Sequence, residues 1–175
     1  PARNRLAAGL LFTCLGAPSV YYGEEIGLTG DNRAPMPWDP AAWNQELRAF
    51  YQALIRLRRT SPALIDGGLQ VLAVEQDTIA FLRDADEEQI IVVGHRGPAA
   101  RPAQPLYVAA GAIPDGAELT ELFSGSRATV AGGWLPLPPL HCSAAETALA
   151  AHREGWLPGR LVRRLSVGYF NGRVR

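Results

Sequence analysis

Near residue 62 the hydrophobic pattern of this chain changes from a helical period to one of short extended segments. The apolar stripe of the last helical segment before that point consists of Leu47, Phe50, Leu54 and Leu57. After it, Pro62 and two consecutive glycines interrupt helical periodicity, and apolar segments alternate with turn signals. The sequence therefore predicts an α/β part up to residue 62 and an all-β part beyond it.

Two helices, one strand and a long loop are predicted for the first part. A helix is expected from the first residues to Gly16, and its apolar face consists of Leu6, Ala7, Leu10, Leu11 and Cys14. Ser19–Tyr22 is short, apolar and aromatic, and predicts a buried strand. Residues 23–44 are rich in proline and glycine and predict a long loop. Long loops in compact folds usually carry functional residues. A second helix is expected from Asn44, its N-cap, to Arg59.

Short strands fill the second part. They are predicted near residues 69–75, 78–83, 89–94, 105–109, 117–123, 127–131 and 134–137. So many short strands in one domain predict an antiparallel sandwich or barrel. The basic segment 151–175 predicts an irregular tail that is solvated or loosely docked, with a binding arm as the alternative.

Charge and cysteine content exclude some classes of function. The 17 basic and 17 acidic residues give a net charge of zero, so no overall field favours nucleic acid or an anionic membrane surface. The apolar runs are too short for a membrane span. Cys14 and Cys142 are expected as reduced thiols of a cytoplasmic protein, with a disulfide as the alternative. His141 beside Cys142 has no third or fourth ligand at a usable spacing, so no metal is expected.

The segment GAPSVYYGEEIGLTG, residues 16–30, carries two adjacent carboxylates and raises the question of an acid–base pair. Glycoside hydrolysis uses two carboxylates on either side of the scissile bond, roughly 5–10 Å apart. Adjacent residues of an extended chain point to opposite faces. Glu24 and Glu25 are therefore not expected to form a catalytic pair. One of them is expected to accept hydrogen bonds from the loop backbone and the other to face solvent.

Two ordered motifs, GAPSVYYGEEIGL and NRAPMPWD, are followed by a helix of the form FYQALIRLRRTSPAL. Together they resemble glycoside hydrolase family 13, the α-amylase superfamily, and especially its neopullulanase, maltogenic amylase and oligo-1,6-glucosidase members. The first motif is matched by Gly16, Pro18, Tyr21, Tyr22, Gly23, Glu25, Ile26 and Gly27. The second is matched by Arg33, Pro35, Met36, Trp38 and Asp39. In the family, the first motif lies on the eighth strand of a (β/α)8 barrel and the second lies in the loop after it.

The resemblance implies a fold class of α/β plus all-β. Residues 1–62 are then the last part of the barrel, with helix 7, strand 8, its loop and helix 8. Residues 63–150 are the antiparallel β-sandwich that follows the barrel, and residues 151–175 are a basic tail. The family's catalytic carboxylates, an aspartate nucleophile, a glutamate acid/base and a stabilising aspartate, lie at the ends of strands four, five and seven. They are expected upstream of Pro1, so the resemblance transfers no catalytic residue to this chain.

Substrate positioning is the role that the resemblance implies for the loop after strand eight. Arg33 occupies the position of an arginine that shapes the subsites on the non-reducing side of the scissile bond. The planar donors of a guanidinium group bind a carboxylate and sugar hydroxyls in fixed directions. Asp31 is its candidate partner, at a spacing shorter than in many relatives. The alternative for Arg33 is an ion pair that braces the loop. The side chains expected to pack rather than to stack on sugar rings are Tyr21, Tyr22, Met36, Trp38 and Trp43.

Two functions of different classes remain open. The first is the C-terminal part of a retaining α-glucan-active glycosidase, a hydrolase or transglycosylase, which is inactive by itself. Its expected partner is an α-glucan or maltooligosaccharide, a homo-oligomer is compatible, and no nucleic acid, membrane or cofactor is expected. The second is a non-catalytic β-sandwich module for carbohydrate binding or assembly, with Trp134 as a platform. Against the second, no aromatic residue neighbours Trp134 in the sequence.

Overall fold

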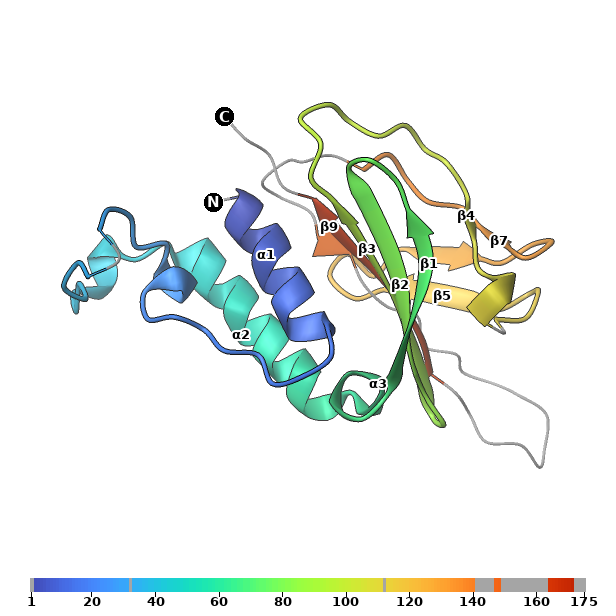
Figure 1. The fold of residues 1–175 in the computed structure, drawn as a ribbon, viewed down its shortest axis with the longest axis horizontal. Coiled ribbons are helices and arrows are strands. Elements are labelled where there is room, and N and C mark those ends of the chain that lie inside the picture. Colours follow the sequence, from blue (N-terminus) through green and yellow to red (C-terminus); the bar gives the residue numbers. More distant parts are fainter. Residues whose placement is uncertain (1, 32, 112, 141–146, 149–163, 172–175) are drawn as a thin grey trace.

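Three layers make up the described structure: a pair of helices, a large sheet and a small sheet (Figure 1). The computed structural model describes residues 2–31, 33–111, 113–140, 147–148 and 164–171. Helices α1 (Ala2–Thr13) and α2 (Gln45–Thr60) pack against one face of the large sheet. The small sheet, made of β4 (Leu106–Tyr107) and β7 (Trp134–Leu135), packs on the other face.

Helix α2 follows the predicted pattern. The side-chain oxygen of Asn44 accepts a hydrogen bond of 2.9 Å from the backbone N–H of Leu47, so the predicted N-cap is confirmed. The buried face of the helix consists of Leu47, Phe50, Tyr51 and Leu54, and Leu57 is partly buried. This apolar stripe attaches the helix to the core, because a helix of this length is marginal without tertiary packing.

Helix α1 occupies the predicted segment, and four residues of its predicted apolar face are partly buried against the core: Leu6, Leu10, Leu11 and Cys14. Ala8 and Phe12 are buried in the cluster shared with α2, whereas Ala7, predicted to be buried, is exposed. Another side of the helix approaches the sheet so closely that a Cβ on Gly94 would lie 3.2 Å from Leu6 Cδ1. Since α1 has two packing partners, a single amphipathic stripe does not describe it.

A short helix, α3 (Pro62–Ile65), follows where the sequence predicts only a break. Ser61 caps it, because its Oγ accepts a hydrogen bond of 3.2 Å from a backbone N–H of the first turn. Proline suits the first helical position, where an N–H has no intrahelical partner. The buried carboxylate of Glu88 accepts hydrogen bonds from Ser61 Oγ and, at 3.1 Å, from the N–H of Ala63. These charge-assisted bonds join α3 to the sheet.

The large sheet has the strand order β1–β2–β3–β9–β5–β6, and β8 pairs with β9. Its strands are β1 (Gly68–Val74), β2 (Thr78–Ala85), β3 (Glu88–His95), β5 (Glu118–Glu121), β6 (Arg127–Thr129), β8 (Thr147–Ala148) and β9 (Arg164–Asn171). The seven predicted strands are confirmed as β1 to β7. Pairing is mainly antiparallel, as predicted, and consistent with a sandwich. β9 instead pairs parallel with β3 and β5, so the prediction of an irregular tail is wrong for residues 164–171.

Alternating side chains give the large sheet two buried faces. In β3, Ile91 and Val93 face the small sheet and pack in one cluster with Leu106 of β4. Ile90 and Val92 face the helices and belong to the second cluster. A strand that is covered on both faces has a nearly continuous apolar sequence, which explains the run from residue 90 to residue 93.

Helices and sheet are joined at Arg83 of β2, whose side chain is fully buried. Its guanidinium donates hydrogen bonds of 2.6–3.2 Å to the backbone carbonyls of Thr13, Cys14, Leu64, Gly67 and Gly68. Arg58 of α2 donates to carbonyls at the end of α1 as well, with 2.6 Å to that of Gly16. Burial, and after it the charge of Arg58, lowers the pKa of Arg83. The two guanidinium groups thus satisfy carbonyls that a helix end leaves without partners.

A bidentate ion pair fixes the far end of β1 and predicts a pH-dependent contribution to stability. Arg101 donates to both carboxylate oxygens of Glu75, at 2.9 and 2.8 Å. The hydrogen bond from Arg101 is the largest cause that lowers the pKa of Glu75, and the charges of Arg101 and His95 and a hydrogen bond from Thr78 act in the same direction. The carboxylate therefore stabilises the fold above its unfolded pKa of about 4.3, and this contribution disappears as the pH falls through the lower folded value.

We expect Glu75→Gln to lower the free energy of unfolding by about 0.5–1 kcal/mol at pH 7, since Glu75 is partly exposed. Urea unfolding at several pH values measures the difference between the two proteins. It should shrink as the pH falls below about 4.3, and it should vanish once the pH is below the lower folded pKa, where the carboxyl group is protonated in both states. A difference that persists unchanged at low pH would show that the charge is not what stabilises the fold.

Three further predictions concern a strand near residue 20, the pair His141 and Cys142, and membrane-spanning helices. The strand predicted at Ser19–Tyr22 is wrong here: residues 19–21 have no regular secondary structure and Tyr22 lies in a turn. A strand forms only where a neighbour supplies hydrogen bonds, and the described ranges place none beside this segment. The predictions for His141 and Cys142 lie outside the described residues. No helix among the described residues is long and apolar enough to cross a membrane.

Candidate functional site

The long loop begins with a tight turn that only glycines permit. Gly23 and Gly27 flank the short 3₁₀ helix η1 (Glu24–Ile26), and both have left-handed backbones, with φ of 87° and 74°. A Cβ on Gly23 would lie 2.6 Å from Leu28 Cδ2, which is closer than such atoms can approach. The carbonyl of Ile26, a buried residue, accepts a 2.9 Å hydrogen bond from the N–H of Asn44. The turn therefore attaches the start of the loop to the start of α2.

Glu24 and Glu25 lie on this turn and differ in their surroundings. Glu24 is exposed, as predicted for one of the pair. Glu25 is partly buried, and its Oε2 is buried without a hydrogen-bond partner among the described residues, so the predicted bond from the loop backbone is not seen at that atom. Burial, and after it the charges of Glu24 and Glu25, raises the pKa of Tyr51 to about 12. Both carboxylates therefore lie near the phenol of α2.

The two tyrosines that precede the turn form an exposed aromatic pair. Their ring centroids lie 4.8 Å apart, and 53% of Tyr21 and 42% of Tyr22 is accessible to solvent. The Tyr22 hydroxyl donates a 2.9 Å hydrogen bond to the carbonyl of Ala34, which brings the second sequence motif back to the first. The prediction that both rings are packed is not met in this chain.

Asp31 and Arg33 lie at the exposed tip of the loop. The Asp31 carboxylate accepts a 3.0 Å hydrogen bond from the backbone N–H of Arg33, and its carbonyl accepts one of 2.9 Å from the N–H of Ala34. This is a local turn in which an aspartate side chain fixes the backbone two residues ahead. Among the described residues, the ion pairs do not include one between the two side chains. The Arg33 side chain is therefore presented to solvent by a backbone that Asp31 holds.

The two tryptophans of the loop differ. Trp43 packs as predicted: its Nε1 donates a 2.6 Å hydrogen bond to the carbonyl of Pro37, and Arg48 lies over its ring at 5.2 Å. Trp38 is 80% exposed, so the packing predicted for it is absent here. Asp39 fixes the backbone after it by accepting a 2.9 Å hydrogen bond from the N–H of Ala41. The loop therefore presents an indole and a guanidinium within six residues.

This arrangement suits the binding of a polyhydroxylated ligand. Aromatic faces cover the apolar faces of sugar rings, and a guanidinium donates directed hydrogen bonds to hydroxyl or carboxylate groups. The adjacent glutamates are differently placed, one exposed and one partly buried, and do not form a pair across a substrate. Within the described ranges, no group of three or more potential metal ligands is found.

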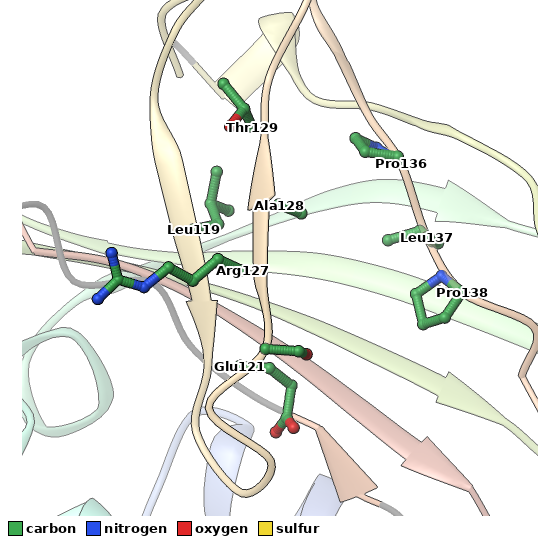
Figure 2. A pocket seen from close by; sticks show the side chains of 9 residues that line it. Leu119, Glu121, Arg127, Ala128, Thr129, Pro136, Leu137 and Pro138 are labelled. Carbon is green, nitrogen blue, oxygen red and sulfur yellow. The ribbon is translucent and has the colours of Figure 1, made fainter.

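A second concave region lies in the β part. It is a hollow of about 620 Å³ between the β5–β6 hairpin and residues 136–138 (Figure 2). The carboxylate of Glu121, one of the residues that line it, accepts hydrogen bonds from the backbone of the hairpin turn, including one of 2.6 Å from Phe123. Arg127 points away from residues 136–138 and forms a 2.7 Å ion pair with Glu118. Since these charged groups bind within the hairpin itself, the loop at residues 23–44 is the better candidate site.

Comparisons with known proteins agree with the two motifs on this loop. A cyclomaltodextrinase from Bacillus sp is 41% identical over 97 residues, which cover 52% of this chain and 17% of the relative. Neopullulanase 2 from Thermoactinomyces vulgaris is 36% identical over 103 residues, covering 55% and 18%. The crystal structure of an Anoxybacillus α-amylase matches with a TM-score of 0.73 and 26% identity, over 89% of this chain and 33% of that one. These matches support a member of glycoside hydrolase family 13, the α-amylase family.

These similarities confirm the resemblance drawn from the sequence, and the match is to the C-terminal part of such enzymes. The chain spans less than a fifth of the length of these two curated relatives. No family model matches the chain. The relatives in the α-amylase family are glycosidases, which hydrolyse the linkages between sugars.

Proposed function

We propose that this chain is the C-terminal part of an α-glucan-active retaining glycosidase. In this proposal residues 1–62 complete a (β/α)8 barrel and residues 63–150 form the β-sandwich beside it. Within the basic tail 151–175, residues 164–171 add a strand to the large sheet. The observation that carries the proposal is the exposed segment at Tyr21 and Tyr22, which belongs to a motif of the α-amylase family but has no strand beside it in the described ranges.

The surface around this segment supports the proposal. Leu15 is 62% exposed and lies close in sequence to the exposed tyrosines. Monomeric proteins seldom leave neighbouring large apolar side chains open to water. The parallel strands of a (β/α)8 barrel are buried on both faces, so further barrel strands would cover such a segment. A polar partner from the same additional part would also satisfy the buried oxygen of Glu25.

Arg33, Asp31 and Trp38 form the contribution of this chain to substrate binding in the proposal. Loops at the carboxyl ends of the strands build the active sites of barrel enzymes, and the loop after strand eight is one of them. Asp31 holds the backbone of the loop tip, Arg33 supplies a directed cation, and Trp38 supplies an exposed ring. In double displacement, a carboxylate nucleophile and an acid/base carboxylate act on the two sides of the sugar. We assign neither of these to this chain.

The relatives indicate the substrate class of the proposal. Their names specify action on cyclomaltodextrins and pullulan, and one is an intracellular maltogenic amylase from Bacillus subtilis. We therefore propose maltooligosaccharides, cyclodextrins or pullulan as substrates and the cytoplasm as the location. A homo-oligomer remains compatible with the proposal.

Two measurements of reducing sugar test the proposal. The complete protein that contains this chain should hydrolyse maltoheptaose, β-cyclodextrin or pullulan and should retain the anomeric configuration in the first product. The purified 175-residue chain should release no reducing sugar from any of them. Turnover by the chain alone, or inversion by the complete protein, would overturn the proposed mechanism.

A further inference from the structure

The small sheet presents an aromatic pair that its strand register creates. Strands β4 and β7 pair so that Leu106 lies opposite Leu135 and Tyr107 lies opposite Trp134. Side chains alternate along a strand, and both leucines are buried in the core of the sandwich. The two aromatic residues therefore point outward, and 48% of Tyr107 and 47% of Trp134 is exposed. No aromatic residue lies near Trp134 in the sequence, but the strand register makes Tyr107 its cross-strand partner.

The backbone holds this pair in one geometry. Gly132 and Gly133 have φ values of 59° and 79°, as a two-residue type I′ hairpin requires, and Ala131 and Trp134 exchange backbone hydrogen bonds of 3.0 Å across the turn. The Asp115 carboxylate accepts hydrogen bonds of 2.9 and 2.7 Å from the N–H groups of the two glycines. A Cβ on Gly133 would lie 3.2 Å from the Tyr107 ring, so glycine also makes room for that ring.

The rings are mutually inclined. Their centroids lie 5.1 Å apart and their planes meet at 60°. Two coplanar rings would suit a flat sugar ribbon such as a β-1,4-glucan, whereas inclined rings suit a chain that curves from one sugar to the next, as an α-1,4-glucan does. The small sheet lies on the opposite side of the large sheet from α1 and α2 (Figure 1). The pair is therefore remote from the loop that carries Arg33.

We propose that Tyr107 and Trp134 form a second binding site, which holds a segment of an α-1,4-glucan chain by stacking on the faces of its sugar rings. The choice of an α-glucan rests on the proposed function, whereas the site itself rests on the exposed, cross-strand and rigidly held rings. A site outside the loop would keep a long substrate attached to the protein between cuts.

Fluorine NMR of the complete protein, labelled with 5-fluorotryptophan, tests this site directly. The chain contains four tryptophans, and the spectrum of Trp134→Ala identifies the resonance of Trp134. Titration with maltoheptaose should shift this resonance to saturation. Tyr107→Ala should raise the dissociation constant for maltoheptaose at this site about tenfold, as expected for loss of one stacked ring. Tyr107→Phe should leave this constant within about twofold of that of the unaltered protein. Ile65→Ala removes an equally exposed apolar side chain from α3 and should leave the titration unchanged.

Each outcome of the titration separates the two proposals. If maltoheptaose does not shift the Trp134 resonance in the unaltered protein, the second site is refuted, and the rings serve the hairpin or contact another part of the protein. An equal shift with cellohexaose would refute the α-glucan specificity. A saturable shift by maltoheptaose alone supports the site even if the hydrolysis assay finds no activity, in which case only the proposed function fails.

Discussion

Arg83→Met should lower the free energy of unfolding by about 3–5 kcal/mol. Methionine keeps most of the side-chain volume but removes every donor from the buried carbonyls at the end of α1 and around the turn before β1. Arg58 still reaches some of the α1 carbonyls but none of those at residues 64, 67 and 68. Urea unfolding followed by far-ultraviolet circular dichroism measures the loss, which is a large part of the stability of an ordinary domain.

Arg127→Met is the matched control for this prediction. Arg127 also lies on a strand and also carries a guanidinium, but it is exposed and pairs with Glu118 across the β5–β6 hairpin. Exposed ion pairs contribute little, so we expect a change within about 0.5 kcal/mol. If both variants lose similar stability, the buried carbonyl contacts of Arg83 do not have the importance inferred from the structure.

Arg33→Ala should lower kcat/KM of the complete protein on maltoheptaose by about tenfold to a hundredfold, which corresponds to roughly 1.4–2.7 kcal/mol of transition-state stabilisation. The arginine is proposed to hold the substrate throughout the reaction, so the change should appear mainly as a higher KM. Arg33→Lys should lie between the two proteins, because it keeps the charge but loses the bidentate fork. Initial rates over a range of substrate concentrations give the two constants.

The control for this prediction also separates substrate binding from the alternative of a loop-bracing ion pair. Arg59→Ala removes an exposed arginine from the last turn of α2 and should leave both kinetic constants within about twofold. A bracing role would instead lower the midpoint of thermal unfolding in Arg33→Ala. Unchanged kinetics together with a lower midpoint would refute the assignment of Arg33 to the substrate site.

Local patterns were sufficient for most of the secondary structure. The N-cap at Asn44, the stripe of α2 and the strands β1 to β7 follow from chemistry within a few residues, so periodicity and turn signals locate them. β9 was missed because its place between β3 and β5 depends on pairing with strands far away in the sequence. The segment at Ser19–Tyr22 was predicted as a strand because its composition fits one, but composition does not supply a pairing partner.

The assignment of Arg33 and Asp31 to a substrate site remains a prediction, and only the positions of these residues in the fold are now known. The two motifs located the loop and singled out Arg33 and Asp31, and the resemblance to the α-amylase family was recognisable from them. The sequence did not show that Asp31 binds the backbone of Arg33, or that Trp38 is exposed while Trp43 is packed. Exposure depends on which other elements cover a residue, and a local pattern does not contain that information.

Helices α1 and α2, strands β1 to β7, the change of pattern near residue 62 and the resemblance to the α-amylase family all follow from the amino-acid sequence. Each depends on neighbouring residues or on short motifs. Two contacts are visible only in the folded chain: Arg83 joins the helices to the sheet, and Tyr107 stands beside Trp134. The physical reason is the same in both cases: hydrogen bonds and ring contacts between residues far apart in the chain depend on strand register, which forms only when the whole sheet is assembled.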